Sequence, residues 1–450
     1  MNTARARWAV AAGAALALGL TACAPPSTDP TPAPTAGGLS GTLEVVSYHP
    51  ENTPLYDRLA ELAEQFEAQH DGLTVEITFG GGPGMPPIMT RYLAGDAPDV
   101  NPTLGGQCPN GELIEGGLTY DLSDALKSDF GDGGTWEDAI HPAVRSQLDS
   151  WVDDSVCMAP ESVTVIQFFY NKKIFAEHGL SVPETIDDLI ETAAALKSAG
   201  QTPFAVTGTF AFYMQLYWDY LMLRHVGAEA YTHAIGGAQV TREPIPGERP
   251  LLADLPGVRD AARDLERLVS DGNILDGFRS TDFTAAQMSF FQGDAAMILM
   301  GSWLVSEMAD AIPEDFEVGT FAFPVATGGA GDQATTIGGV QGLSVAADAK
   351  NPEAAIEWLK FIGQADVQAT YASEFGAISG YKAAPAPEGF EAVVDMLADG
   401  EMQMMYFGLL GQSAEIQAAI HEPLTQLFFG QIGADEMVTQ MSQRLDAANG

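Results

Sequence analysis

The chain has 450 residues, and its 61 acidic and 20 basic side chains give a formal net charge of −41. A surplus of this size disfavours nucleic acid, an anionic lipid surface or a strongly anionic substrate as the main partner, because like charges repel. Hydrophobic residues make up 46% of the chain, which is enough to build a core and argues against disorder. The length predicts about two or three folding units.

The first 40 residues have the composition of an export signal followed by a tether. Two arginines precede an uncharged, mostly apolar run over 8–20, which is shorter than the roughly 20 residues that a membrane span needs. The motif Leu-Thr-Ala-Cys ending at Cys23 resembles a bacterial lipobox, and the Pro-rich stretch after it is typical of a semi-extended linker. We predict a signal peptide at 1–22, then a lipidated Cys23 and tether at 23–40. The protein would be extracytoplasmic and would contact the outer face of the cell membrane through the lipid anchor only.

Two further cysteines, Cys108 and Cys157, lie in the body of the chain. Outside the cytoplasm a disulfide between them is expected. It would close a loop of about 50 residues, worth roughly 4 kcal/mol in the chain-entropy model. The alternative is two unrelated buried thiols. Two cysteines without a neighbouring histidine cluster do not make a zinc site, so no metal is expected.

The body of the chain begins with a β-α-β pattern. The segment LEVVSY over 43–48 predicts a buried strand, and apolar residues at helical spacing predict a helix over 54–70. TVEITF over 74–79 predicts a second strand, which the crossover makes a parallel neighbour of the first. A short helix over 89–94 and a strand end at 99–100 follow. This alternation predicts a doubly wound α/β lobe.

The alternation continues, without an internal repeat, through a second predicted lobe. Strands are predicted over 163–170, 204–207 and 295–300, and helices over 187–199, 210–224, 253–269 and 285–291. Later helices are predicted from 351, with Asn351 as N-cap, and over 413–429 and 434–448.

Motifs of catalysis and cofactor binding are nearly absent from the sequence. It has no G-x-S-x-G, no G-x-x-x-x-G-K-[ST] and no H-E-x-x-H. The glycine-rich segment 80–84 is not followed by the lysine of a phosphate-binding loop. Residues 271–273 resemble the start of a calcium-binding loop, but Leu275 stands where such a loop has an oxygen ligand. Acidic pairs such as Asp153 and Asp154 are expected by chance at this content of Asp and Glu. The two catalytic carboxylates of a glycosidase would leave the same trace in the sequence. We therefore predict no catalytic residue, no metal and no cofactor.

Four segments in order carry a family resemblance. The first is APDV at 97–100, followed by GG at 105–106, and the second is YNKKIF at 170–175, followed by GL at 179–180 and PET at 183–185. The third is FQGDAAM at 291–297, followed by GSW at 301–303. The fourth is GGVQGLSV at 338–345, followed by NPEAA at 351–355. Together, behind a lipobox, they resemble the extracellular solute-binding proteins of ABC importers, in the carbohydrate-binding, maltose-binding-protein-like family. The resemblance covers roughly residues 41–450.

The resemblance implies an α/β fold of two doubly wound lobes with a hinge and an interlobe ligand cleft, the type II periplasmic-binding-protein arrangement. By position, lobe one would comprise 41–161 and 315–370. Lobe two would comprise 162–314 and 371–450.

The resemblance also implies ligand-binding residues. Trp303, which ends the G-S-W segment, is expected to stack on a sugar ring; the alternative is a core tryptophan. Aromatic faces suit the C–H faces of sugars, and acids and amides suit the hydroxyls. The other candidates, each with a core or loop alternative, are Trp218, Tyr217, Tyr48, Glu51, Asn52, Asn101, Thr103, Gln107, Tyr406 and Phe407.

The function expected from these observations is capture of a sugar or oligosaccharide by a monomer and its delivery to the transmembrane subunits of an ABC permease. Sugars are neutral, which agrees with the acidic composition. No nucleic acid partner and no enzymatic activity are expected. One alternative is a secreted glycan-active enzyme. Another is a receptor for a different small solute such as a polyamine; the acidic charge favours a cationic ligand, whereas the expected stacking role of Trp303 counts against it.

Overall fold

The computed structural model describes residues 38–80, 86–103, 112–131, 134–150, 153–236, 247–270, 272–400, 402–406 and 414–449. The stretch Leu39–Gly450 forms one compact unit, which is described below. The predicted signal peptide and Cys23 lie outside the described residues. Among the described residues, no helix combines the length and the apolar character needed to cross a bilayer.

The first lobe is built on three parallel strands. β1 (Gly41–Ser47) pairs with β2 (Leu73–Phe79) on one side and β3 (Val100–Thr103) on the other. Helix α1 (Pro54–Glu67) connects β1 to β2, and Leu59, Leu62, Ala63 and Phe66 form its buried face. The predicted β-α-β unit is confirmed, with each apolar position of the helical repeat directed at the core.

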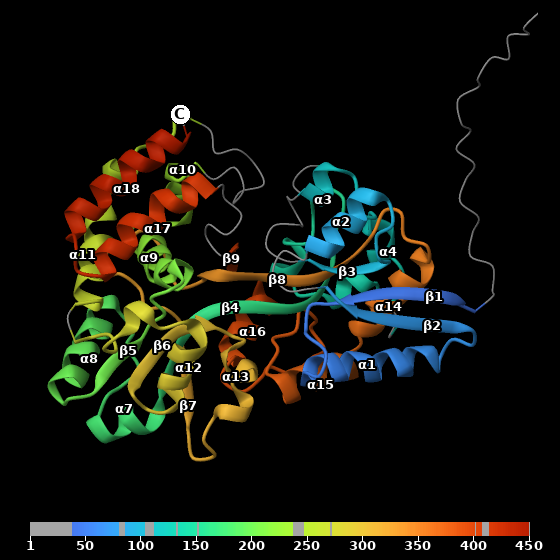
Figure 1. Cartoon of the computed structure of the whole chain (residues 1–450), viewed down its shortest axis with the longest axis horizontal. Coiled ribbons are helices and arrows are strands. Elements are labelled where there is room, and N and C mark those ends of the chain that lie inside the picture. Colours follow the sequence, from blue (N-terminus) through green and yellow to red (C-terminus); the bar gives the residue numbers. More distant parts are fainter. Residues whose placement is uncertain are drawn as a thin grey trace, which may run out of the picture. The chain divides into compact units, whose positions relative to one another are not determined.

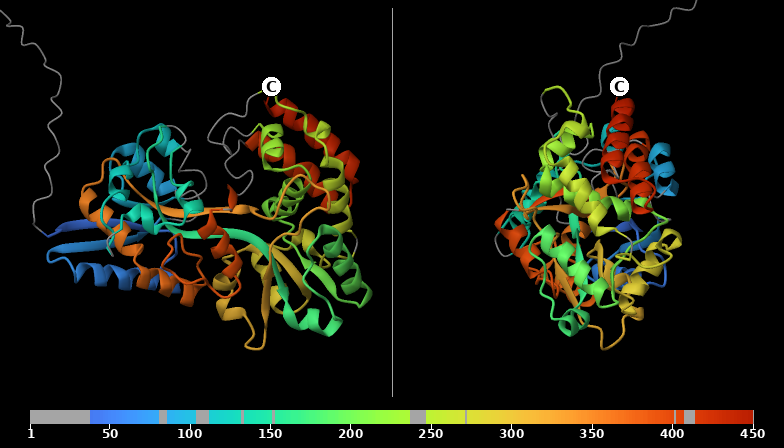
Figure 2. Two further views of the ribbon diagram at one scale, coloured as in Figure 1. Left: turned by 180° about the vertical axis from the view of Figure 1, so that it is seen from behind. Right: turned by 90° about the vertical axis from the view of Figure 1, so that its left-hand side faces the viewer.

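Helices cover both faces of this sheet. In Figure 1, α1 lies on one face together with α14 (Pro352–Ile362) and α15 (Ala365–Phe375), while α2 (Pro86–Ala94) and α3 (Glu112–Glu115) lie on the other. The view from behind shows the same arrangement (Figure 2). Three short helices complete the lobe: α4 (Ser123–Leu126), α5 (Trp136–Ala139) and α6 (Pro142–Arg145). Helix α16 (Glu391–Asp399) contacts α6.

Asp99 of the APDV segment connects β1 to the Asn-Pro start of α14, which is far from it in the sequence. Its Oδ2 accepts a hydrogen bond from the Glu44 amide of β1 at 2.9 Å. Its Oδ1 accepts from the amides of Lys350 and Asn351 at 2.6 and 2.9 Å. Asn351 occupies the predicted N-cap position before Pro352, but its side chain makes no cap hydrogen bond and instead donates to the Ser40 carbonyl at 3.0 Å.

Two long strands cross from the first lobe to the second. β4 (Ala159–Asn171) and β8 (Thr335–Val345) are antiparallel partners, and the strand order is β2-β1-β3-β8-β4-β6-β5. The late part of β8 pairs with β3, and the late part of β4 pairs with β6 (Ala295–Gly301) and β7 (Val318–Phe321). Figure 1 shows this strand pair running between the two groups of helices.

The second lobe surrounds the far ends of these strands. Its remaining strands are β5 (Thr202–Ala205), which is parallel to β6, and β9 (Gln403–Tyr406), which pairs with the start of β8. Its helices are α7 (Lys172–His178), α8 (Ile186–Ser198), α9 (Ala211–His225), α10 (Ala228–Ala234), α11 (Val258–Leu268), α12 (Phe283–Phe291), α13 (Leu304–Glu307), α17 (Ala414–Phe428) and α18 (Ala434–Asn449). Helix α9 is buried on nearly every side, which agrees with its lack of polar face.

The lobe boundaries expected from the sequence stay a prediction, and one stretch argues for a change. Residues 376–384 follow α15 and contact α5 and α6 of the first lobe. The Trp136 Nε1–H donates to the Tyr381 hydroxyl at 3.2 Å, and the His141 amide donates to the Gly380 carbonyl at 3.0 Å. These contacts favour placing 376–384 in the first lobe rather than with 371–450 in the second.

Candidate functional site

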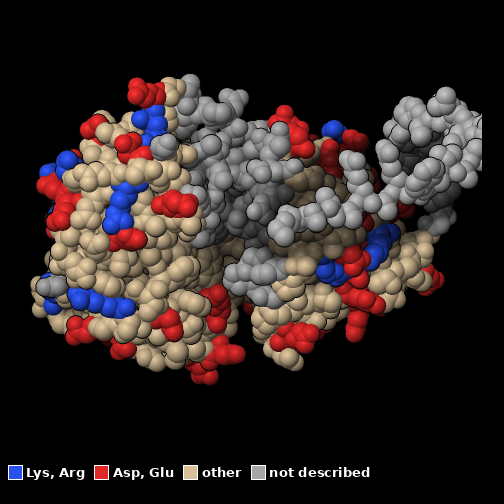
Figure 3. All heavy atoms as spheres, turned by 45° about the horizontal axis from the view of Figure 1, so that its top comes forward, with Lys and Arg blue, Asp and Glu red and all other residues tan. Residues whose placement is uncertain are grey.

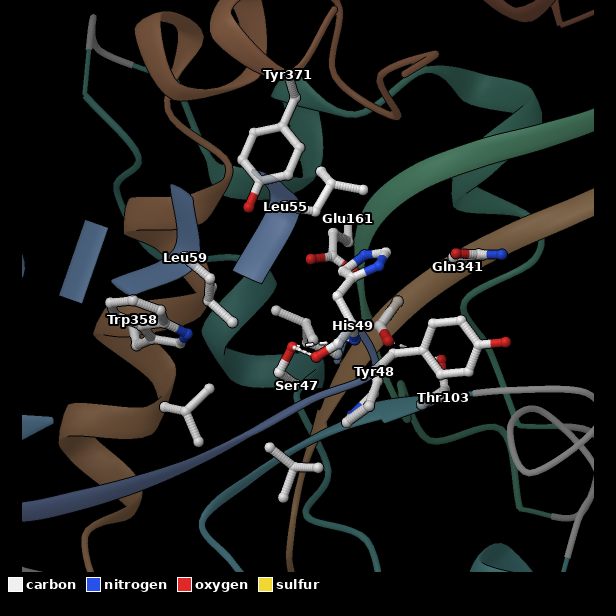
Figure 4. A pocket seen from close by; sticks show the side chains of 15 residues that line it. Ser47, Tyr48, His49, Leu55, Leu59, Thr103, Glu161, Gln341, Trp358 and Tyr371 are labelled. Atoms are coloured by element: carbon white, nitrogen blue, oxygen red, sulfur yellow. Dashed lines mark hydrogen bonds between the residues drawn. The ribbon is translucent and has the colours of Figure 1, made fainter. Parts of the chain in front are cut away.

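A pocket lies where β1 ends and the crossing strands pass. It is bounded by β1, β3, β4 and β8 and by helices α1, α14 and α15 (Figure 4). Its polar lining comes from Ser47, Tyr48, His49, Thr103, Glu161, Gln341 and Tyr371. The carboxyl end of a parallel strand is where open α/β sheets place their ligands. The sequence predicted Tyr48 and Thr103 for this site but did not predict Glu161, Gln341 or Tyr371.

The turn after β1 is held by its own hydrogen bonds. The Ser47 Oγ accepts from the His49 amide and donates to the His49 carbonyl, each at 3.0 Å. Asn52 has a φ of 65°, a left-handed conformation that asparagine tolerates better than most residues. Glu51 and Asn52 are both exposed on this turn. Because the backbone of the turn is satisfied locally, their side chains remain accessible to a ligand.

Glu161 of β4 is the acidic side chain of this pocket, and it points into it with His49 and Tyr371 (Figure 4). Burial raises the pKa of the Glu161 carboxyl to about 7, and no basic side chain offsets that shift. Burial also lowers the pKa of His49. The pocket therefore holds a carboxyl and an imidazole that favour their neutral forms, and both can exchange hydrogen bonds with hydroxyl groups.

The raised pKa of Glu161 gives a pH dependence with a definite sign. The fold favours the protonated carboxyl, so the stability it contributes is fully present below the unfolded value of 4.5 and is lost as the pH rises through about 7. We expect Glu161→Gln to stabilise the protein at pH 8 by up to about 3 kcal/mol and to change little at pH 5. Urea unfolding at the two pH values tests this, with Glu191→Gln on the exposed face of α8 as control. Equal effects of Glu161→Gln at pH 5 and pH 8 would contradict it.

Three groups from opposite lobes share one electrostatic neighbourhood. Tyr48 follows β1, whereas Tyr213 lies on α9 and Glu307 on α13. Burial and then the charge of Glu307 raise the pKa of both tyrosines, and Tyr48 adds to the effect on Tyr213. Burial raises the pKa of Glu307 as well, and its Oε2 accepts from the Gln287 side chain at 3.0 Å. The three groups are thus near enough for the charge of Glu307 to affect both tyrosines, although they come from different lobes.

An aromatic cluster extends from Tyr213. Its ring stacks on Phe283 with centroids 6.3 Å apart, and Phe210 and Phe212 lie 5.8 and 5.2 Å from it. Phe210 is 49% exposed and Phe283 is 42% exposed, which is unusual for phenylalanine. Tyr213 is itself buried, so Phe210 and Phe283 provide the exposed aromatic surface of this cluster. The sequence indicated Tyr217 and Trp218 of the same helix as candidates instead.

Trp218 and Tyr217 lie one turn further along α9 and belong to the core. Trp218 has 0% and Tyr217 has 2% of its surface exposed. The Tyr217 ring contacts Phe168, Phe204 and Phe428. Neither ring offers surface to a ligand in this structure.

Trp303 is partly buried and stands at the start of α13. Its ring lies directly on Gly301, where an added Cβ would come within 2.1 Å of the ring. The Ser302 amide donates to the Val165 carbonyl at 2.9 Å and fixes the segment to β4. The Trp303 carbonyl accepts from the Glu307 amide one turn later at 2.9 Å. The G-S-W segment therefore holds the indole against the backbone, beside the helix that carries Glu307.

The remaining predicted residues divide into two groups. Asn101 and Thr103 are buried, and their side chains donate hydrogen bonds to backbone carbonyls. The Asn101 Nδ2 donates to the Pro98 carbonyl at 2.7 Å, and the Thr103 Oγ1 donates to the Gly342 carbonyl at 3.0 Å. Gln107, Phe407 and Cys108 lie outside the described residues, as does the side chain of Tyr406. Cys157 is buried in the first lobe. In the described part of the chain, no cluster of three or more metal-ligating side chains occurs.

Comparison with known proteins decides the family. The model of the bacterial extracellular solute-binding proteins matches residues 49–369. The chain belongs to this family. The resemblance drawn from the four sequence segments is thereby confirmed at family level.

Relatives and solved structures of this family agree. The solute-binding protein is 25% identical over 327 residues to the multiple sugar-binding protein of Streptococcus mutans serotype c, covering 72% of each chain. Over 166 residues, 36% of each chain, it is 26% identical to the melibiose/raffinose/stachyose-binding protein MelE of Bacillus subtilis. Among solved structures, apo RafE from Streptococcus pneumoniae superposes with a TM-score of 0.70 at 19% identity, covering 92% of this chain and 100% of that one. The predicted fold class is confirmed.

The surface of the solute-binding protein keeps its acidic surplus. Figure 3 shows acidic side chains distributed over the visible face, with fewer basic ones set beside them. On α11, Arg259 pairs with Asp435 at 2.9 Å and Arg267 with Asp264 at 2.9 Å. Since such basic side chains are already paired, the surface remains unfavourable for anions.

Proposed function

We propose that this protein is the substrate-binding component of an ABC importer, which captures a sugar or oligosaccharide between its lobes and delivers it to the permease. The observation that carries the proposal is the match of residues 49–369 to the solute-binding family, together with a polar pocket at the end of β1 beside the crossing strands. Tyr48 of this turn is also near enough to Glu307 of the other lobe for the charge to affect its pKa. A ligand held there would touch both lobes at once, and closure of the lobes would remove it from water. The names of the sugar-binding relatives support the same ligand class.

The chemistry of the site suits a neutral, hydroxyl-rich ligand. Trp303 and the cluster around Tyr213 supply aromatic surface for the C–H faces of sugar rings. Glu307, Glu161 and the turn residues Glu51 and Asn52 supply acceptors for hydroxyl groups. A phosphorylated or nucleotide ligand would bring negative charge next to these acidic side chains, which disfavours its binding.

The proposal extends to location and assembly. The export signal and lipobox support a lipoprotein held by Cys23 on the outer face of the cell membrane. A ligand-filled monomer would dock on the transmembrane subunits of the permease, and the protein itself would catalyse no reaction. The sugar would be released unchanged, which separates this proposal from a glycan-active enzyme.

We also propose the disulfide between Cys108 and Cys157. The burial of Cys157 and the extracytoplasmic location support it. We expect Cys157→Ser to destabilise the protein by roughly 4 kcal/mol through the loop entropy released in the unfolded chain. Peptide mass spectrometry without reductant should show the crosslinked pair, and a reduced Cys108 peptide in the untreated protein would refute it.

Thermal unfolding of the full chain against a ligand panel tests the function. The panel contains mono- and oligosaccharides, with spermidine and amino acids as controls. A ligand present at 100 times its Kd adds about 2.7 kcal/mol of stability, which raises the midpoint. A shift with one sugar class, and no new product after incubation, would support the proposal. A shift with spermidine alone, or cleavage of an oligosaccharide, would exclude it.

A further inference from the structure

The crossing strands part at one identifiable pair of residues. β4 pairs with β8 as far as Val165 opposite Gly338, and the same register would next place Ile166 opposite Ile337. Farther along, Phe168 to Asn171 pair with β7, while β6 occupies the other edge of β4. Ile166 therefore lies in the gap between the end of β8 pairing and the start of β7 pairing.

A side chain fills this gap. The Ile337 amide, which would bond the Ile166 carbonyl in a continued ladder, donates to the Tyr220 hydroxyl at 3.2 Å. The Tyr220 hydroxyl in turn donates to the Ile166 carbonyl. A phenol has a single proton, so the Thr336 Oγ1, 2.8 Å away, is the donor to Tyr220. The hydroxyl is thus inserted into the ladder with all its hydrogen-bonding capacity used.

The ring of Tyr220 is fixed as firmly as its hydroxyl. Tyr220 is 1% exposed on α9, and its ring stacks on Phe323 with centroids 4.8 Å apart and planes at 7°. The Arg224 guanidinium lies 5.2 Å from the ring centroid. Just before the gap, a Cβ at Gly338 would come within 2.3 Å of the Thr164 carbonyl oxygen. The strands are closely apposed at Gly338 and held apart one residue later.

We propose that Tyr220 is the positioning residue of the hinge: its hydroxyl replaces the last backbone hydrogen bond between β4 and β8 and fixes where the two crossing strands part. The inference rests on the proposed function, in which the lobes close around a ligand. Because both strands connect the lobes, the point where they separate defines the axis about which the lobes can turn. A bridge through one hydroxyl keeps the strands joined while their angle changes.

Tyr220→Phe in the full chain tests this without any ligand. The retained ring keeps the strands apart, so the Ile337 amide and the Ile166 carbonyl lose their partner. We expect hydrogen exchange in 335–338 to become at least about tenfold faster and the distribution of interlobe distances to broaden. Exchange is measured by mass spectrometry. Distances are measured by pulsed electron resonance between spin labels on non-canonical amino acids at the exposed positions Glu64 and Glu191.

Two further variants separate a hinge role from lost stability. Tyr231→Phe removes another buried phenol hydroxyl, which donates to Asp219 at 2.6 Å and does not touch the crossing strands. Thr336→Val removes one donor but leaves the bridge intact. Both should keep wild-type distances. Equal exchange in Tyr220→Phe and Tyr231→Phe, or an unchanged distance distribution in Tyr220→Phe, would overturn the proposal. Absence of sugar binding would overturn the proposed function and leave these readouts unaffected.

Discussion

Trp303→Ala is expected to weaken binding of the sugar identified by thermal unfolding by about 100-fold, which corresponds to about 2.7 kcal/mol. The indole lies against Gly301 at the start of α13, so its orientation is set before a ligand arrives. A preoriented aromatic ring loses little entropy on binding, and its removal therefore costs most of the stacking energy. Isothermal titration calorimetry on the full chain measures the loss.

Three variants sharpen this prediction. Trp303→Phe keeps a smaller stacking face and should lose less affinity than Trp303→Ala. Phe283→Ala removes exposed aromatic surface beside Tyr213 and should weaken long oligosaccharides more than short ones. Tyr120→Ala removes an aromatic that is 38% exposed near the far end of β8 and should leave affinity unchanged. If Trp303→Ala bound the sugar as tightly as wild type, the indole would be a core residue and the proposed site would lie elsewhere.

Local pattern was sufficient to predict most of the elements of this fold. The repeat that places Leu59, Leu62 and Phe66 on one face of α1 is set by residues within four positions of each other. The same holds for β1 and β2, whose parallel pairing follows from the short crossover between them. The expectation that Trp303 binds the ligand rests on motifs of fixed spacing and stays a prediction.

Roles that depend on distant pairing could not be predicted in this way. Glu161 enters the pocket because β4 crosses against β8, and Tyr48 is near enough to Tyr213 to affect the pKa of Tyr213 because α9 and β1 approach from different lobes. Tyr220 takes its role from Ile166 and Ile337, which are far apart in sequence. None of these pairings leaves a periodic trace along the chain.

Aromatic content misled the sequence analysis where burial decided the outcome. Tyr213, Tyr217 and Trp218 lie within two turns of one helix, and composition does not distinguish them. The helix is buried on nearly all sides from Phe212 to Arg224, and the exposed aromatic surface lies just before it, at Phe210.

Arg224 is a buried cation that donates to backbone carbonyls, and its position explains how the start of β8 is held. It is 1% exposed, and its guanidinium donates to the carbonyls of Asp332 and Thr335 at 2.6 and 2.8 Å. It also donates to the Phe323 carbonyl, with Nη2 at 3.2 Å. Burial lowers the pKa of Arg224. The carbonyl dipoles replace the water that the charge loses, and the planar fork matches their arrangement.

Arg224→Met is therefore expected to lower the free energy of unfolding by about 3 kcal/mol, because the buried carbonyls of Thr335 and Phe323 and the partly buried carbonyl of Asp332 would lose this donor, which a thioether cannot replace. Arg224→Lys should lose nearly as much, since a single ammonium cannot reach all three acceptors. Arg263→Met on α11 provides the matched control: its side chain is 55% exposed, and its surface ion pairs should contribute less than about 1 kcal/mol. Urea unfolding of the full chain compares the three. A loss below about 1 kcal/mol in Arg224→Met would mean that water satisfies these carbonyls. In that case the start of β8, and with it the hinge beside Tyr220, would not depend on Arg224.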